Sequence, residues 1–391
     1  MDILRQLRAT TRILAVALIG IAFRVSSANA TPEPPAKLMP PSKPFVPKKP
    51  FLTTSYEVVL LGPFYYDGTK PETFHAYYYE PDYPRDKHHD RIFERNARMW
   101  KERMPSLLQA AGKSANLKTK MVIQLGNLMQ GECGSPSLSR KMIKEALETY
   151  KKAFPKTPCL TTPDRHDRRG HGAAAAYDAA VFPFISKELR RTVKKATFCQ
   201  MQGPDLFLFI DSAQPDIEEI EKTFREHQTA RYKFVVCAAP LIPIDDWSAP
   251  NLLFGRKPDP RRRMRELFLK NDVIVLSHGE GLIGLSEVIT DSGRITQLLV
   301  DSVFTHKNAA IPRAEASGAR DYGKFQPNKD EMRKKKKQDW RPILYEYKNA
   351  LTRYERYRFA GFGVLKISGE GVVAEIHGGD SAKVAKTFKL R

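Results

Sequence analysis

Cysteine is scarce in this chain of 391 residues. The four cysteines are Cys133, Cys159, Cys199 and Cys237, and no two of them have the Cys-x-x-Cys spacing of a zinc ribbon. Four cysteines allow three complete disulfide pairings, so the sequence leaves the pairing open. Cys133 and Cys159 flank one predicted helix, and they are the pair to test first.

Acidic residues are also in short supply. Lysine and arginine number 65 against 44 aspartates and glutamates, which gives a net charge of +21. Basic clusters stand at Arg261–Arg263 and at Arg333–Lys337. Such a charge favours phosphate-bearing or polyanionic ligands, and it is equally typical of a solvated basic surface. The lysine run lies in a polar loop without interleaved aromatic residues, so no specific nucleic-acid module is predicted.

No apolar run is long enough for a transmembrane helix. The longest, Ile13–Phe23, follows three arginines and precedes the small residues Ala28-Asn29-Ala30. This arrangement predicts a signal peptide over residues 1–30, cut after Ala30, with an uncleaved membrane anchor as the alternative. We therefore expect an exported protein, periplasmic or secreted, without a transmembrane segment in the mature chain.

Proline is concentrated near the amino terminus, with eight prolines in residues 31–52. That stretch is predicted to be a semi-extended linker. The first folded domain is expected over 53–310, followed by a basic loop over 311–337. A helix and strands over 338–391 are expected to complete the same domain.

A nucleophile elbow of the form Gly-x-Ser-x-Gly is absent. Cys237 follows a hydrophobic strand, and an inert core cysteine is the preferred interpretation of it.

Strand and helix patterns alternate along the chain. We expect an α/β layered fold with functional groups at the strand ends. Strands are predicted at 56–62, 120–126, 159–161, 196–200, 206–211, 232–238, 273–277, 295–304, 361–368, 371–377 and 383–390. Helices are predicted at 89–112, where Pro105 is a point of splitting, and at 137–154, 173–191, 214–228, from 258, and over 338–358.

Five of the predicted turns share an order and a setting. They are Gly62-Pro63-Phe64-Tyr65, Gly126-Asn127, Asp164-Arg165-His166-Asp167, Cys237-Ala238-Ala239-Pro240 and His278-Gly279-Glu280-Gly281. In these blocks the chain resembles the calcineurin-like metallophosphoesterases. The resemblance implies a two-sheet β-sandwich flanked by helices, here with a C-terminal β extension. It also implies a dinuclear metal centre at the strand ends.

The residue types at the implied ligand positions do not suit metals. These positions hold Pro63, Tyr65, Asn127, Arg165, Ala238, Gly279 and Gly281. Metal-dependent phosphoester hydrolysis needs several carboxylate and imidazole ligands, so no metal cofactor is expected. Only His166 and Asp167 match the family pattern. The resemblance would make His166 a general acid and Asp167 its orienting partner, both now vestigial.

Two alternatives remain open for the polar groups. His278 and Glu280 could form a relocated metal site with His166, Asp167, Cys237 or Asp301, or they could be ordinary loop residues. Arg165 and His166 could bind a phosphate or sulfate group, or Arg165 could pair with Asp164 or Asp167 and fill the cavity. The sequence predicts a catalytically inactive, metallophosphoesterase-like binding or scaffold module for an anionic ligand. The alternative is a phosphoester hydrolase with a relocated metal site.

Overall fold

A computed structural model describes residues 54–68, 87–131, 133, 135–244, 248, 251–254, 257–279, 281–322 and 341–391. By its internal contacts the chain divides into Met1–Pro50 and Phe51–Arg391, and every described residue belongs to the second unit. The predicted signal peptide, the proline-rich linker, Glu280 and the lysine run at 333–337 lie outside the described residues.

The first sheet mixes parallel and antiparallel strands. In the described part of the chain it has six strands in the order β14-β13-β12-β1-β2-β3. The strands β1 (Tyr56–Leu61), β2 (Thr119–Gln124) and β3 (Cys159–Thr161) run parallel. The strands β12 (Gly361–Ser368), β13 (Gly371–Gly378) and β14 (Val384–Lys389) form an antiparallel extension that joins at β1. Residues more than 300 positions apart therefore share one sheet.

The second sheet has eight described strands in the order β10-β11-β8-β9-β7-β6-β5-β4. Its centre is parallel: β5 (Asp205–Ile210), β6 (Lys233–Cys237), β7 (Ile274–His278) and β9 (Gly293–Val300). The remaining strands pair antiparallel, namely β4 (Phe198–Gln202), β8 (Ile283–Thr290), β10 (Arg313–Ser317) and β11 (Leu351–Arg358).

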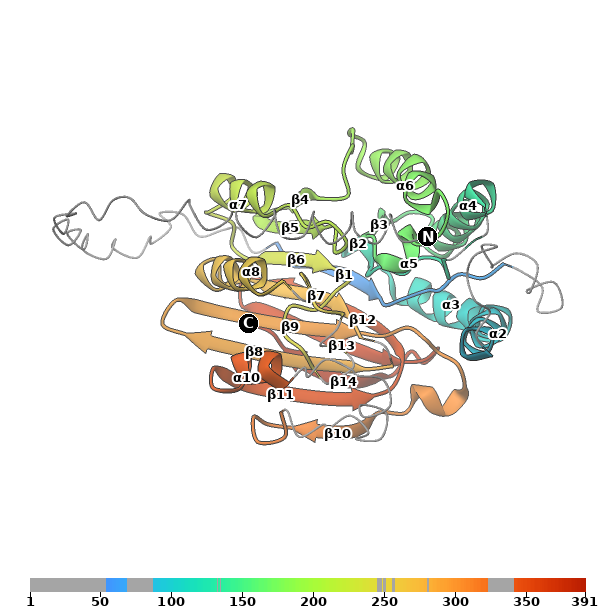
Figure 1. The fold of residues 1–391 in the computed structure, drawn as a ribbon. Coiled ribbons are helices and arrows are strands. Elements are labelled where there is room, and N and C mark those ends of the chain that lie inside the picture. Colours follow the sequence, from blue (N-terminus) through green and yellow to red (C-terminus); the bar gives the residue numbers. More distant parts are fainter. Residues whose placement is uncertain are drawn as a thin grey trace, which may run out of the picture. The chain divides into compact units, whose positions relative to one another are not determined.

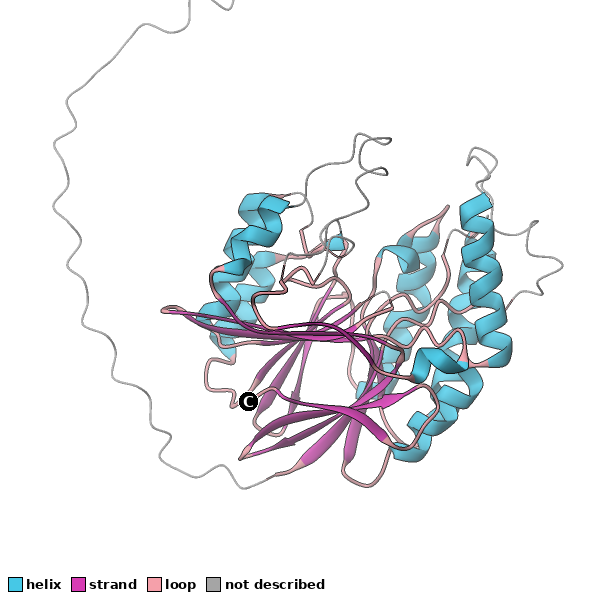
Figure 2. Cartoon of the chain, turned by 90° about the horizontal axis from the view of Figure 1, so that it is seen from below, coloured by secondary structure: helices cyan, strands magenta, loops and turns pink. Residues whose placement is uncertain are grey.

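Helices lie outside the two stacked sheets (Figure 2). A group formed by α2 (Lys87–Glu102), α3 (Met104–Ser114), α4 (Pro136–Ala153) and α6 (Ala173–Leu189) shares its core with the first sheet. The second sheet carries α7 (Ile217–Glu226), α8 (Pro258–Lys270) and α10 (Arg341–Lys348) on its outer face. Two short elements, α5 (Arg165–Arg168) and η3 (Lys307–Ala310), lie in connections (Figure 1).

Alternation along the strands of the second sheet separates two cores. Phe207 and Phe209 of β5 face the first sheet, whereas Leu206 and Leu208 face the outer helices. This is the period of two that a strand covered on both faces requires. The predicted fold class, an α/β two-sheet sandwich flanked by helices with C-terminal strands, is confirmed.

One polar contact also joins the two sheets. Tyr56 of β1 donates from its hydroxyl to Asp205 Oδ2 at the start of β5 (2.8 Å). The same carboxylate receives Arg231 through Nε (2.9 Å) and Nη2 (2.6 Å). Because Asp205 is fully buried, these partners compensate its desolvation.

The helix predicted over 338–358 is wrong in its second half. Helix α10 ends at Lys348, and residues from Leu351 form β11, paired with β8. Burial alternates along this segment: Tyr354 and Arg356 are buried, and Glu355 between them is less so. Such alternation is typical of a strand and not of a helix. Near Pro105 the other long helix divides as expected, into α2 and α3 on either side of Arg103.

The disulfide between Cys133 and Cys159 is not formed. Cys133 Sγ lies 3.5 Å from the Met142 sulfur, and Cys159 Sγ lies 3.5 Å from the Thr157 carbonyl oxygen. Burial raises the pKa of the Cys159 thiol, so this group stays protonated in the core. Within the described residues, no helix combines the length and apolarity that crossing a bilayer would demand.

Candidate functional site

Five of the chain's strand ends meet where the parallel strands finish. The turns after β1, β2, β3, β6 and β7 contain the five sequence blocks, and they come together at the carboxyl edge of both sheets. Gly62 lies against the end of β9, because a Cβ there would lie 2.6 Å from Ser302 N and Val300 O. Its amide donates to Ser302 Oγ (2.8 Å), which fixes the first turn against the end of β9.

Tyr65 and Asn127 occupy the first two blocks and bind each other. Both residues have positive φ, 47° and 53°, a left-handed conformation that asparagine tolerates better than tyrosine. The Asn127 carbonyl oxygen accepts the amides of Phe64 (2.9 Å) and Tyr65 (2.8 Å). The Asn127 side chain donates from Nδ2 to the Tyr65 hydroxyl (3.0 Å). The two turns are thus locked together by the residues at the implied ligand positions.

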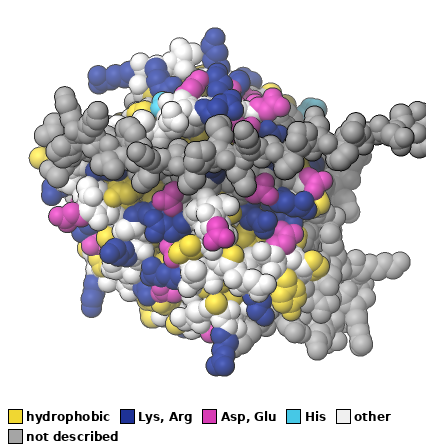
Figure 3. Space-filling model, turned by 90° about the vertical axis from the view of Figure 1, so that its left-hand side faces the viewer, with side chains coloured by type: hydrophobic (Ala, Val, Ile, Leu, Met, Phe, Trp, Pro, Cys, Tyr) yellow, Lys and Arg dark blue, Asp and Glu magenta, His cyan; other side chains and the backbone are white. Residues whose placement is uncertain are grey.

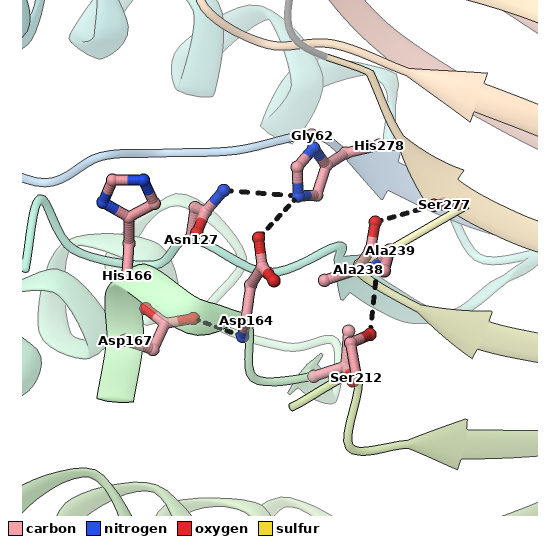
Figure 4. A network of polar contacts seen from close by, with 12 residues as sticks. Gly62, Asn127, Asp164, His166, Asp167, Ser212, Ala238, Ala239, Ser277 and His278 are labelled. Carbon is pink, nitrogen blue, oxygen red and sulfur yellow. Dashed lines mark hydrogen bonds and ion pairs between the residues drawn. The ribbon is translucent and has the colours of Figure 1, made fainter. Parts of the chain in front are cut away.

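His278 and Asp164 form the centre of this network (Figure 4). His278 Nε2 lies 3.1 Å from Asp164 Oδ2 and 3.2 Å from Asn127 Nδ2. Burial opposes ionisation of Asp164, but the hydrogen bond and charge of His278, the amide of Arg165 and the charge of His166 together lower its pKa to about 2. Asp164 is therefore ionised at neutral pH and bonded to the imidazole.

The interpretation of His278 as a loop residue is wrong. It is the last residue of β7 and is 7% exposed. Of the other proposed partners, Asp301 follows β9, where its Oδ1 accepts the Val303 amide (3.1 Å). Cys237 is buried, and burial together with the charge of Asp164 raises the pKa of its thiol to about 12. That thiol is protonated at neutral pH, as expected for a core cysteine.

Asp167 holds the third turn in place. It is fully buried, and its two oxygens accept the amides of Met129 (3.2 Å) and Asp164 (2.9 Å). Burial raises its pKa to about 7, against the opposing effect of these backbone hydrogen bonds. The neighbouring His166 directs Nδ1 to the Gln130 carbonyl oxygen (3.1 Å). Asp167 thus orders the backbone of two blocks.

Arg165 lies at the mouth of a cavity of about 200 Å³. The side chain is exposed, and it lines the cavity together with Asp164, His278, Ser212 and Asn251. The apolar wall comes from Ile244, Leu252, Leu282 and Leu299. Arg165 is among the described residues that line this cavity, and His166 is not. The two side chains proposed as one anion site therefore do not share this cavity. A pocket with an apolar wall and few convergent polar groups is typical of a small-ligand site.

The remaining block positions contribute backbone only. Ala238 is fully buried, and its carbonyl oxygen accepts the Ser277 hydroxyl (2.7 Å). Gly279 lines the cavity, and a Cβ there would lie 2.8 Å from Leu282 O. Gly281 adopts φ +73° in the following turn. Pro63 is buried beside Gly62 and carries no donor atom.

A dinuclear metal centre does not fit these residues. Pro63, Ala238, Gly279 and Gly281 offer no side-chain ligand, and Tyr65 bonds Asn127. Across the described residues, no group of three or more histidines, cysteines, aspartates and glutamates lies close enough together to hold a metal ion. Such ions need several anionic or imidazole ligands in a fixed geometry.

Two site residues escaped the sequence reasoning. The sequence suggests Asp164 only as a partner of Arg165, and no pattern in it singles out Ser212. In the structure Ser212 Oγ accepts the Ala239 amide (3.0 Å) at the cavity wall. The signal for Asp164 was present, because an aspartate before a short helix with Asp167 three residues later is a capping pattern.

No family model matches the chain, and no curated protein matches it. Among solved structures, the chain is similar to purple acid phosphatase PPD1 from yellow lupin (TM-score 0.48, 12% identity, 87% of this chain, 54% of the other). It is also similar to PhoD (0.49, 11%, 86% and 68%) and to GAP50, the anchor in the inner membrane complex of Plasmodium (0.42, 11%, 86% and 89%). The lupin enzyme and PhoD have metallophosphoesterase-type folds. The chain spans about half the length of the lupin enzyme.

Proposed function

We propose that this chain is a catalytically inactive, metallophosphoesterase-like protein that is exported and acts as a binding or scaffold module. The observation that carries the proposal is the set of polar contacts among Tyr65, Asn127, His278 and Asp164 at the strand ends. Tyr65 and Asn127, at two of the implied ligand positions, bond each other. The Asp164 carboxylate is bonded to His278 and is therefore not available to bind a cation.

The proposed ligand carries an anionic group and an apolar portion. Arg165 supplies a guanidinium fork that matches phosphate or sulfate oxygens. Beside it, Ser212 and Asn251 add polar groups, and the leucines of the cavity wall add apolar surface. Ionised Asp164 faces the same cavity, so the ligand's anionic group belongs on the Arg165 side.

Metal content and hydrolysis test the loss of catalysis. The purified protein is incubated with manganese, iron, zinc and magnesium, desalted and analysed for metals, and then assayed with p-nitrophenyl phosphate. We expect background metal and no turnover above buffer. About two tightly held ions per chain, or turnover that depends on added metal, would overturn the proposal.

Binding of phenylphosphonate, which cannot be hydrolysed as an ester, tests the ligand class. We expect Arg165→Gln to weaken binding by about tenfold, because one charge-assisted contact is lost. Arg262→Gln removes an equally permanent charge from an exposed position on α8 and serves as the matched control. Equal binding by the wild type and Arg165→Gln would remove Arg165 from the ligand site.

One observation favours the alternative of a relocated metal site: His278 and Asp164 are already within 3.1 Å of each other. If Glu280 joined them, the pair His278→Ala and Glu280→Ala would abolish metal retention and any phosphatase activity. Unchanged metal content and activity in this double variant would eliminate the relocated site.

A further inference from the structure

A second cavity opens at the other end of the same parallel strands. Its volume is about 340 Å³, and its charged lining residues are Arg231, Lys233, Asp272, Arg294 and Arg391. Lys233 begins β6, Asp272 precedes β7 and Arg294 is the second residue of β9. The cavity therefore lies at the amino ends of these strands, whereas the candidate site lies at their carboxyl ends.

The two cavities are separate. Strand β6 runs over five residues from Lys233 to Cys237, a length of about 16 Å at the usual rise per residue. Strand β6 begins toward the left-hand side of Figure 1, and Figure 3 shows that side. Lysine and arginine side chains spread over this side, with carboxylates between them. Lys233, the first residue of β6, lines the amino-end cavity (Arg231, Lys233, Asp272, Arg294 and Arg391).

The charges of the amino-end cavity do not balance. Arg231 is paired with Asp205, and the three other cations that line the cavity, Lys233, Arg294 and Arg391, face one carboxylate, Asp272. Asp272 is shared between Arg294 (3.2 Å) and Arg391 (3.4 Å). The Val372 amide of β13 donates to the backbone oxygen of Arg391 (3.4 Å), so this oxygen points toward β13. Unbalanced cations around a hollow create a positive potential that attracts anions.

Arg231 lines this cavity and is paired with Asp205 behind it. Its side chain is 10% exposed, with Nε and Nη2 on Asp205. The remaining nitrogen, Nη1, is buried and has no hydrogen-bond partner among the described residues. A buried guanidinium donor without an acceptor is unfavourable unless something binds it. Because Nη1 is shielded from solvent, an anion in the cavity would act on Arg231 through its charge and not through this hydrogen bond.

Lys233 is an uncompensated cation. It is half-buried, and within the described part of the chain no carboxylate comes within ion-pair distance of its ammonium. Burial lowers its pKa, while the charge of Asp272 acts in the opposite direction. A bound anion would restore the lost solvation of this ammonium group.

We propose that the amino-end cavity binds a phosphate or sulfate group. The Lys233 ammonium and the Arg294 guanidinium would donate to its oxygens, and the charge of Arg231 would add to the positive potential. Tetrahedral oxyanions carry several strong acceptors, which suits a cluster of donors from different strands. The inference is independent of the proposed function, because it rests on other residues at the other end of the sheet.

Calorimetric titration with sodium phosphate and sodium sulfate, at constant ionic strength, tests this site. We expect saturable binding by the wild type and a loss of at least about tenfold in affinity for the double variant Lys233→Gln, Arg294→Gln. The matched control is Lys141→Gln with Arg262→Gln, whose side chains are 69% and 60% exposed elsewhere. The control pair keeps wild-type affinity if the site is specific.

Asp272→Asn gives a prediction of the opposite sign. Asn keeps the shape of the side chain and tolerates the left-handed backbone there, φ 53°. Removing the one lining carboxylate should tighten phosphate binding by about threefold. Weaker binding by Asp272→Asn, no binding by the wild type, or wild-type affinity in the Lys233, Arg294 variant would each overturn the proposal.

Arg165→Gln separates this site from the candidate site. If phosphate affinity falls with Arg165→Gln and not with the Lys233, Arg294 variant, the anion binds at the carboxyl ends and the present inference fails. Vesicles with phosphatidylinositol 4-phosphate, compared with phosphatidylcholine alone, distinguish a lipid headgroup from a free anion. Sedimentation of the wild type but not the double variant with the first vesicles would assign the group to a lipid.

Discussion

The two ends of the parallel strands handle charge in opposite ways. At the carboxyl ends, Asp164 is ionised and paired with His278, and Asn127 bonds the Tyr65 hydroxyl. At the amino ends, Lys233 and Arg294 line a cavity with more cations than carboxylates. The five sequence blocks lie at the first end, where polar side chains bond one another. The excess of positive charge lies at the second end.

The largest expected effect comes from adding a carboxylate to the closed end. Asn127→Asp would place a second buried negative charge beside Asp164. We expect the free energy of unfolding to fall by about 4 kcal/mol, since buried like charges are both desolvated and repelled. Urea denaturation at pH 7 measures it, with exposed Asn308→Asp as the control. Unchanged stability would mean that these side chains accommodate a second carboxylate, which is what a cation-binding site does.

Removing the imidazole should have the next largest effect. His278→Ala leaves Asp164 ionised, buried and without its partner, and should reduce the free energy of unfolding by about 3 kcal/mol. The double variant His278→Ala, Asp164→Asn should recover at least half of this loss, because no buried carboxylate is then left without its partner. Exposed His171→Ala is the control. Equal stability of the single and double variants would contradict the pairing.

The pH dependence of stability should separate two carboxylates of one turn. Asp164 has a folded pKa of about 2 against an ordinary 3.8, so its contribution is present above pH 4 and lost as the pH falls through 2. Asp167 has a folded pKa of about 7, so its contribution is present below pH 4 and lost as the pH rises through 7. At about 1.36 kcal/mol per pKa unit, Asp164 contributes about 2 kcal/mol and Asp167 about 4 kcal/mol.

Denaturation from pH 2 to pH 8 checks these windows. We expect Asp164→Asn to remove part of the fall in stability below pH 4, and Asp167→Asn to remove part of the decline between pH 4 and pH 7. A wild-type profile in both variants would show that neither carboxylate changes its affinity for protons on folding.

The smallest expected effect is at the open end, and its sign is reversed. Lys233→Gln removes a cation from an excess of cations and should raise the free energy of unfolding by about 0.5 kcal/mol. Lys141→Gln on the surface of α4 should be neutral. A clear loss of stability in Lys233→Gln would show that the ammonium has a structural partner, and it would weaken the contrast between the two ends.

The fold was largely predictable because hydrophobic runs mark strands. Strand β1 and the paired strands β12 and β13 follow directly from such runs. The segment after Lys348 was misread because tyrosines and charged residues there also fit a helix, and only pairing with β8 decides for a strand. A single sequence does not contain that long-range pairing.

The candidate site was predictable in place and less so in detail. The five blocks do meet at the strand ends, as their order suggested. The glycines after His278 favour the loop alternative, although β7 extends one residue further and the ring is buried. The contact between His278 and Asp164 spans 114 positions, so it depends on the packing of two connections rather than on local pattern.

The link between Tyr56, Asp205 and Arg231 gives the amino-end cavity a practical use. Since Arg231 is tied through Asp205 to a strand of each sheet, an occupant that engages it would resist separation of the sandwich. Any compound that binds only the native state raises the unfolding free energy, by about 2.7 kcal/mol at one hundred times its Kd. Melting temperature is thus a label-free screen for natural occupants, in which Lys233→Gln, Arg294→Gln reports false positives.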